Sequence, residues 1–320
     1  MLIKKILCLF ILLVGFLFGF NVKASNNYVL LGGDAIGIDI PSNVTVIGFY
    51  SVNTEDGRNN PWENSNIKED DIIISIDGIV VNSINDVSNF IENKTFVTLK
   101  LQRDKEYVYT SINVISNEKG KSTIGLYLKD KILGVGTLTF INPNTDKYAA
   151  LGHSVQNGKS NGKLLSSTIS SIRKAIPGTP GEKQALLTST EIGTITKNSN
   201  IGIFGHMRDF NQRKRMEIEK ASKVKTGKAQ IATVISKDKI EYFDIEIIEV
   251  KSQSKAATKG IKVRVVDSRL IEQTGGIIQG MSGSPIIQND KIVGALSHVV
   301  VSSPSLGYGV FAEWMYEECK

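Results

Sequence analysis

The chain has 320 residues, of which 41% are hydrophobic and 22% are charged, a balance typical of a water-soluble globular protein. At about 150 residues per domain, this length predicts two domains. Two cysteines cannot form a disulfide framework or a cysteine zinc cluster, and the chain has only three histidines. The sequence has no HExxH, Walker or GxGxxG motif, so we expect neither a metal nor another cofactor.

Residues 212–228 contribute much of the net charge of +6. Glu217 and Glu219 interrupt this basic stretch, and no aromatic residue lies within it. We therefore expect a solvated surface that is attracted to an anionic membrane, and no nucleic-acid site.

Residues 1–24 have the order of an export signal. Lys4 and Lys5 precede an apolar run over residues 6–20, and the small-residue exit Val22-Lys23-Ala24 follows. The run is short for a helix that spans about 30 Å of hydrocarbon. We expect this segment either to be cleaved after export or to remain as a membrane anchor, with the rest of the chain outside the cytoplasm.

Residues 25–115 are predicted to form short strands and one helix. Asp77-Gly78 is a hairpin signal, and Asn85 is the candidate N-cap of a helix that covers residues 86–91. The stretches 95–103 and 106–114 form a predicted strand pair.

This segment resembles a PDZ domain, through a Gly-Ile-Asp-Ile strand at residues 37–40, the turn and strand at 68–73, and residues 76–81 before the helix. Asp70 stands where that family usually has glycine. The resemblance implies an α+β domain that binds an extended peptide at a strand edge. That edge would be Ile36, Gly37 and Ile38, with Val87 on the helix completing the groove. The alternative is a small β-rich packing domain without a ligand.

Residues 116–122 are polar and contain a glycine, and are expected to form a linker. Residues 123–320 contain many short apolar runs separated by turn residues, which predicts a mainly β body with a barrel or double barrel. The runs are 132–140, 192–196, 231–235, 243–250, 261–266, 286–287 and 292–296.

The string Gly280-Met281-Ser282-Gly283-Ser284-Pro285 resembles the nucleophile turn of chymotrypsin-like serine peptidases. Glycines allow a sharp turn that exposes the hydroxyl of Ser282. In that geometry the backbone amides of Gly280 and Ser282 would form an oxyanion hole. The alternative is an ordinary Gly/Ser hairpin.

A serine hydroxyl needs a base, and in the chymotrypsin arrangement the chain order is His, Asp, Ser. His153 follows a small-residue strand and is the preferred base, with His206 as the competitor. His298 lies beyond the serine and is expected in the core or in the wall of a pocket.

The third member of such a triad would be a carboxylate between the histidine and the serine. Asp267 is preferred because it ends a predicted strand, fifteen residues before Ser282. Spacing alone leaves Asp209, Asp238 and Asp244 as competitors.

These residues carry a closer resemblance, to the stage IV sporulation protein B peptidases. It rests on residues 150–153, Asp267, residues 275–288 and 307–310, and Glu313-Trp314. It implies an N-terminal PDZ-like domain before a chymotrypsin-like double β-barrel, with His153 as base, Asp267 as orienter and Ser282 as nucleophile.

In that family, the peptidase is exported from the forespore into the space between two membranes. It cleaves itself in its N-terminal region and then cuts a membrane-held regulator. The cut releases an intramembrane metalloprotease that matures a late sigma factor. The competing hypothesis for this chain is a catalytically inactive, PDZ-containing envelope scaffold.

Overall fold

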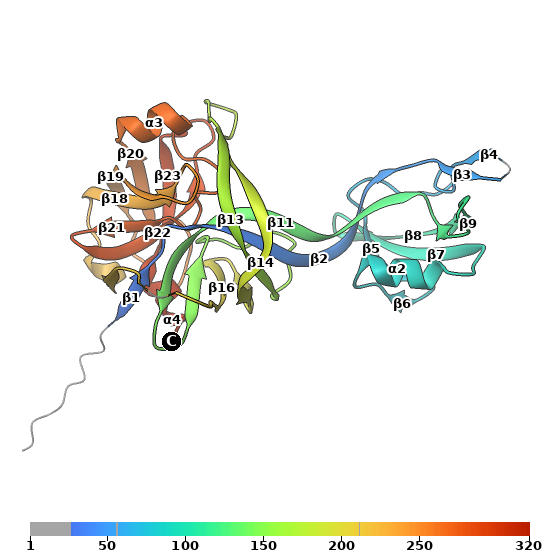
Figure 1. Cartoon of the computed structure of the whole chain (residues 1–320), viewed down its shortest axis with the longest axis horizontal. Helices are drawn as coiled ribbons and strands as arrows, with labels where there is room; N and C mark the ends of the chain where they lie inside the picture. The colour runs from blue at the N-terminus through green and yellow to red at the C-terminus, as the bar shows by residue number, and fades with distance from the viewer. Residues whose placement is uncertain (1–26, 56, 211) are drawn as a thin grey trace, which may run out of the picture.

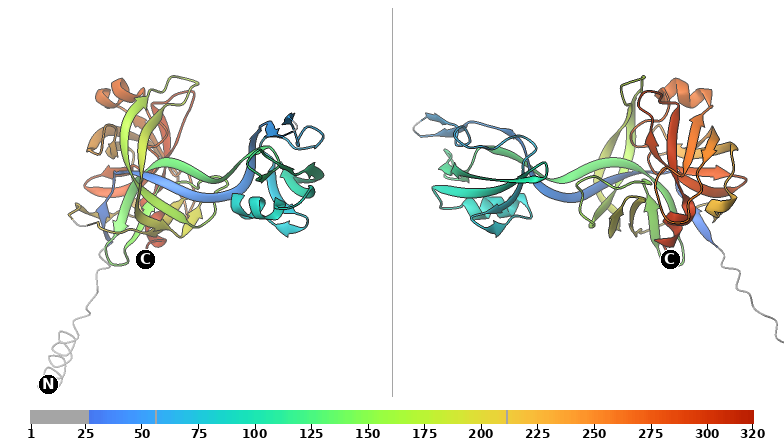
Figure 2. Two further views of the ribbon diagram at one scale, coloured as in Figure 1. Left: turned by 45° about the vertical axis from the view of Figure 1, so that its right-hand side comes forward. Right: turned by 180° about the vertical axis from the view of Figure 1, so that it is seen from behind.

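The computed structural model describes residues 27–55, 57–210 and 212–320. The predicted export segment lies outside these residues, and within them no helix combines the length and apolarity that a membrane span requires. Figure 1 shows a larger and a smaller lobe, joined by the long strands β2 (Ala35–Phe49) and β11 (Leu126–Asn142). Both views in Figure 2 show these two strands running together between the lobes.

The C-terminal half of the larger lobe is a closed six-stranded antiparallel barrel. Its strands follow one another in hydrogen-bonded order and return to the first: β18 (Gly227–Val234), β19 (Ile240–Val250), β20 (Ile261–Val265), β23 (Leu306–Phe311), β22 (Lys291–Val299) and β21 (Pro285–Gln288). Alternate residues of β18 to β20 point inward, as half-buried strands require. Ile231, Phe243 and Val263 thereby form part of one apolar core.

The N-terminal half of the larger lobe forms a second barrel. β2 pairs with β11 and β13 (Gly162–Arg173), β11 with β12 (Lys147–Ala150), and β12 with β16 (Gly202–His206). β13 continues to β14 (Glu182–Ile195), which approaches β16 through a bridge between Gly193 and Met207. The predicted double β-barrel is therefore confirmed.

Shorter elements tie the barrels together. β17 (Arg215–Ile218) pairs with β1 (Tyr28–Leu31) of the first barrel and with β22 of the second. The remaining elements of this lobe are β15 (Lys197–Ser199), the 3-10 helix η1 (Ala221–Lys223), α3 (Ser268–Thr274) and α4 (Ala312–Glu317). Part of the predicted basic surface is thus a structural strand, with Met216 and Ile218 buried.

In its described residues, the smaller lobe combines the sheet strands β5 (Ile72–Ile76), β6 (Ile79–Val80), β7 (Phe96–Arg103) and β8 (Glu106–Asn113) with the helix α2 (Ile84–Ile91) and two separate two-stranded sheets. Those two sheets pair β3 (Val52–Thr54) with β4 (Gly57–Asn59), and β9 (Ile115–Ser116) with β10 (Ser122–Thr123). Its core runs from Val44 to Leu126 in sequence and includes Val87 and Ile91 of α2.

Local backbone geometry explains several sequence features of this lobe. Asp70 adopts φ 69°, the left-handed conformation that favours glycine. Asp77 and Gly78, both with positive φ, form the predicted hairpin between β5 and β6. The cap of α2 differs from the prediction: Ser83, not Asn85, caps the helix, in a reciprocal pair with Asp86 that satisfies two backbone N–H groups.

The boundaries of the small lobe differ from residues 25–115. Val29 and Ile36 pack in the cores of the larger lobe, while Ile124 packs in the smaller one. The expected linker is a hairpin of the small lobe, since β9 pairs with β10. The small lobe is therefore an insertion between the outer halves of β2 and β11.

The predicted peptide-binding edge at Ile36, Gly37 and Ile38 is wrong. These residues pair with β11 on one side and with β13 on the other. Because both edges of the strand are occupied, no peptide can add there. The strand belongs to the core of the N-terminal barrel, whereas Val87 lies in the small lobe.

Candidate active site

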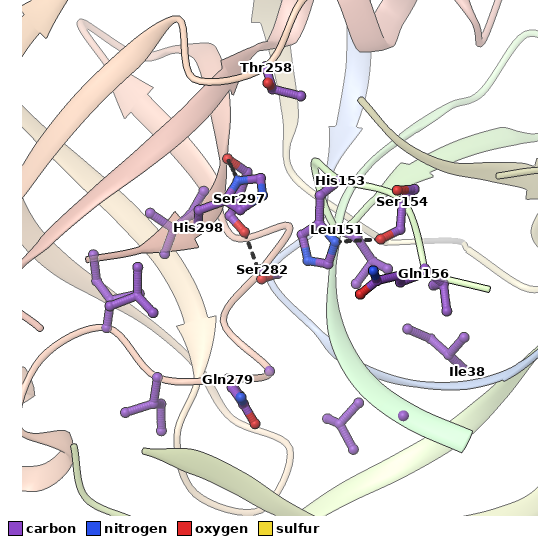
Figure 3. A pocket seen from close by; sticks show the side chains of 18 of the residues that line it. Ile38, Leu151, His153, Ser154, Gln156, Thr258, Gln279, Ser282, Ser297 and His298 are labelled. Atoms are coloured by element: carbon purple, nitrogen blue, oxygen red, sulfur yellow. Dashed lines mark hydrogen bonds between the residues drawn. The ribbon is translucent and has the colours of Figure 1, made fainter. Parts of the chain in front are cut away.

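A cavity of about 890 Å³ lies between the two barrels and is lined by residues from both. The first barrel contributes Leu151 and His153, and the second contributes Ser282 and His298. Figure 3 shows the His153 ring and the Ser282 hydroxyl side by side in this cavity. The predicted base and nucleophile are thus brought together from positions 129 residues apart in the chain.

His153 reaches the cavity through a sharp turn after β12. Leu151 and Gly152 have φ of 68° and 67°, and a left-handed Leu151 is costly for a residue with a side chain. The isobutyl group of Leu151 is buried in the barrel core, which offsets this cost. The turn directs the following imidazole away from the barrel and into the cavity.

The tautomer of His153 follows from its hydrogen bond. Nδ1 lies 2.8 Å from the carbonyl oxygen of Ser154, and because a carbonyl only accepts, Nδ1 carries the proton. Nε2 then has a free lone pair, as a general base requires. Burial lowers the pKa of His153 below its usual 6.5, although the Ser154 carbonyl opposes this shift.

Ser282 sits on a turn that needs glycine next to it. Gly283 has φ 96°, and a Cβ there would lie 1.9 Å from the carbonyl oxygen of Thr137. The Ser282 hydroxyl donates to the carbonyl of Ser297 at 3.1 Å. In this state the Ser282 hydroxyl is held by the second barrel and makes no hydrogen bond to His153.

Two backbone amides near the Ser282 hydroxyl have no protein acceptor among the described residues: those of Gly280 and Ser282. The peptide before Gly280 is fixed because Lys183 N donates to the Gln279 carbonyl at 2.9 Å. The peptide before Ser282 is fixed by Ser284, whose amide and hydroxyl both donate to the Met281 carbonyl. Planar trans peptides then fix the direction of both free N–H groups, as an oxyanion hole needs.

His298 forms part of the wall of the same cavity, in one of the two places expected for it. Its ring lies 5.4 Å from that of His153, centroid to centroid. Its Nδ1 is 2.9 Å from the hydroxyl of Ser297, which itself donates to the Tyr308 carbonyl. Burial, and then the proximity of His153 and Lys259, lower the pKa of His298, so both rings favour the neutral form near pH 7.

Asp267 is not brought to His153. Its carboxylate caps α3 by accepting from Arg269 N at 2.9 Å, binds the Arg269 guanidinium at 2.8 Å, and accepts from Asp244 N at 3.2 Å. The Arg269 side chain is the main cause of its lowered pKa, and desolvation opposes that shift. Asp267 does not line the cavity that holds His153 and Ser282.

The model of the family "SpoIVB peptidase S55" matches residues 120–316. The chain belongs to this family. No curated protein sequence matches the chain. Among solved structures, the active form of the Rv3671c protease from M. tuberculosis is 13% identical over 57% of this chain and 70% of that one, with a TM-score of 0.35. Its inactive form is 13% identical over 57% and 81%, also with a TM-score of 0.35.

The other candidates from the sequence lie outside the cavity of this S55 peptidase. His206 is exposed on β16, and Asp209 and Asp238 line a separate pocket. Asp244 accepts from the side chain of Gln230. No carboxylate lines the cavity that holds Ser282, among the residues that the structure describes.

Val87 lines a groove in the small lobe of the peptidase. This groove encloses about 420 Å³ between α2 and residues 122–128. Leu126 and Leu128 pair with β2 on one side only, and no strand pairs with their other edge within the described parts of the chain. A strand edge beside a helix is the geometry in which an extended peptide can bind.

Sequence reasoning missed two groups that shape the site. The Ser154 carbonyl is a backbone group and leaves no mark in the sequence. Thr137 is fully buried and donates its hydroxyl to the Gly280 carbonyl at 2.7 Å. The signal for Thr137 is its place in the run 132–140, in which Thr137 and Thr139 are the two polar residues.

Proposed function

We propose that this chain is an exported serine endopeptidase in which Ser282 is the nucleophile and His153 is the general base. The observation that carries the proposal is the shared cavity, where a histidine with a free Nε2 faces a serine flanked by two unsatisfied backbone amides. These are the components that acyl transfer requires.

Catalysis begins when the Ser282 hydroxyl leaves the Ser297 carbonyl and donates to Nε2 of His153. As Oγ attacks the carbonyl carbon of the scissile peptide, its proton moves to the imidazole. The amides of Gly280 and Ser282 donate to the oxygen that becomes negative. The imidazolium then protonates the leaving amine. In the second half of the reaction, His153 removes a proton from water, the water attacks the acyl-enzyme, and the imidazolium returns a proton to Oγ of Ser282.

Two groups compete for the role of orienting His153. Family resemblance assigns this role to Asp267, and reaching His153 would require Asp267 to leave Arg269 and the α3 amide. The Ser154 carbonyl already receives the Nδ1 proton and fixes the tautomer. The geometry therefore favours a Ser–His dyad that is oriented by a backbone carbonyl.

The substrate class follows from the family. We propose cleavage of the chain's own N-terminal region and of a membrane-held regulator of an intramembrane protease, in the space between two membranes during sporulation. Export from the forespore and retention at a membrane surface belong to the same proposal. The groove beside α2 supports a role for the small lobe in holding an extended segment of substrate.

The test measures hydrolysis of casein and self-fragmentation by the purified protein. Ser282→Ala should abolish both, while Ser302→Ala, which changes an exposed serine, should retain them. If the fragments formed by Ser282→Ala match those of the wild type, Ser282 is not the nucleophile. The absence of both activities from the wild type would favour the inactive scaffold.

A further inference from the structure

Lys183 is a buried lysine that the mechanism above does not use. Its side chain on β14 is almost fully buried, and no carboxylate lies within ion-pair distance of its ammonium in the described part of the chain. The neighbouring Glu182 is paired with Arg173 at the surface. Burial without a counter-ion is costly for a lysine, so packing alone does not account for its presence.

The contacts of Lys183 lead to the nucleophile turn. Its ammonium donates to the hydroxyl of Thr233 at 2.7 Å and to that of Thr137 at 3.4 Å. Thr137 in turn donates its hydroxyl to the Gly280 carbonyl, and its amide to the Ser282 carbonyl at 2.9 Å. The side chain of Lys183 therefore connects β14, β11 and β18 behind the turn.

The stem of Lys183 also packs against the turn. A Cβ placed on Gly280 would lie 3.0 Å from both Cβ and Cδ of Lys183. The Lys183 amide holds the Gln279 carbonyl, so one residue contacts the turn through its backbone, its methylenes and, by way of Thr137, its charge. Buried lysines whose pKa is shifted by desolvation concentrate at functional sites.

We propose that Lys183 is a positioning residue of this active site: its ammonium, through the Thr137 hydroxyl, fixes the turn that carries the oxyanion donors and places a positive charge behind them. The proposal rests on the serine-peptidase function proposed above. In this role the Lys183 ammonium helps to stabilise the negative charge that develops on the tetrahedral intermediate in a desolvated site.

Protonation of Lys183 provides a separate readout. Desolvation lowers the pKa of Lys183 to about 7, and the groups that face its ammonium are the hydroxyls of Thr137 and Thr233, which do not titrate. The charged form is lost as pH rises through this value, so its contribution to the rate should fall above pH 7. Over the same range folding stability should rise, because the unfolded chain still binds the proton.

The experiment measures phosphonylation of the full protein by a fluorophosphonate probe, separating the maximal rate kinact from the probe affinity KI. Lys183→Met should lower kinact about tenfold or more, less than the 10²–10³-fold loss on removing an oxyanion donor directly, with KI unchanged. The decline of kinact above pH 7 should disappear in this variant. Lys174→Met, at an exposed lysine, is the control.

Two further variants separate positioning from folding. Thr137→Val should resemble Lys183→Met, and Thr137→Ser should recover most of the loss. Thermal unfolding of Lys183→Met should occur at the wild-type temperature or higher, because an uncompensated buried charge has been removed.

A wild-type kinact in Lys183→Met, or an unchanged alkaline decline, would overturn the proposal. So would a loss of kinact that is matched by a loss of folded protein. If the wild type itself does not react with the probe, the peptidase function fails first, and this inference fails with it.

Discussion

At the scale of single residues, neighbouring groups decide what each predicted side chain can do. Glycine-rich turns and chain order singled out His153 and Ser282 as the candidate base and nucleophile, and both line one cavity. The partner of Nδ1 was not predictable, since it is the Ser154 carbonyl. Asp267 shows the limit of spacing: a carboxylate at a strand end can equally cap the helix that follows, and here it does.

Variants of Asp267 separate the two candidate orienting groups. Asp267→Ala should lower the free energy of unfolding by about 1 kcal/mol through loss of the helix cap, with little effect on phosphonylation of Ser282. In the wild type, the stability that the Asp267 carboxylate contributes should be lost only in acid, as pH falls through the lowered pKa of Asp267. A loss of activity beyond about 10³-fold, without a matching loss of stability, would restore Asp267 as the orienter.

At the scale of elements, left-handed residues place the functional groups. Short apolar runs separated by turn residues predicted most strands of the C-terminal barrel, and the glycines of the serine motif predicted a turn. The runs did not mark β13 or β16 of the N-terminal barrel. The isolated bridge that closes the first barrel, between Gly193 and Met207, depends on packing between distant strands and has no local signature. The pairing of β2 with β13 has no local signature either. Because of it, the predicted free edge at residues 36–38 is paired on both sides.

Gly283→Ala tests the nucleophile turn. The left-handed backbone costs roughly 1–2 kcal/mol for a residue with a side chain, and the new Cβ would overlap the Thr137 carbonyl. We expect a lower melting temperature and a loss of phosphonylation. Gly178→Ala is the control, because its Cβ meets nothing within 4 Å although its φ is 87°; this variant should lose stability only. Equal phosphonylation in both variants would contradict the geometry described for the turn.

The groove beside α2 can be tested in the same way. Ser88 lines the groove and Asn89 is exposed next to it on the helix. Ser88→Arg should weaken binding of a peptide from the chain's own N-terminal region, measured by fluorescence polarisation, because the long side chain occupies the groove. Asn89→Arg should bind as the wild type does. If the two variants bind equally well, the peptide does not occupy this groove.

At the scale of the whole molecule, the small lobe is an insertion at the far end of the strand pair β2 and β11. β2 and β11 pair over Ala35–Pro41 and again over Thr45–Phe49, with a register shift between the pairs Pro41–Lys131 and Thr45–Lys129. An irregularity of this kind bends a strand pair, and this one lies between the two lobes. Chain length predicted two domains, and the sequence placed their boundary at residues 116–122, which form a polar hairpin of the small lobe. The boundary could not be located from the sequence because the small lobe shares its strands β2 and β11 with the barrel.

Excising the small lobe tests this arrangement. Joining Pro41 to Lys131 through an Asn-Gly turn should give a folded peptidase, since a two-residue turn suits the closure of an antiparallel pair. Its circular dichroism and its phosphonylation rate should remain near those of the wild type. Deletion of residues 25–115 should not fold, because it removes β1 and the first half of β2 from the barrel cores. Folding of both deletions would contradict the insertion.

The most direct measurement is the rate of fluorophosphonate labelling as a function of pH, with the labelled residue located by mass spectrometry. The account predicts a single adduct on Ser282. Its rate should fall in acid with a midpoint below 6.5, the usual pKa of histidine, because burial lowers the pKa of His153. His153→Ala should react far more slowly and without this midpoint. An adduct on another serine, or an unchanged rate in His153→Ala, would contradict the account.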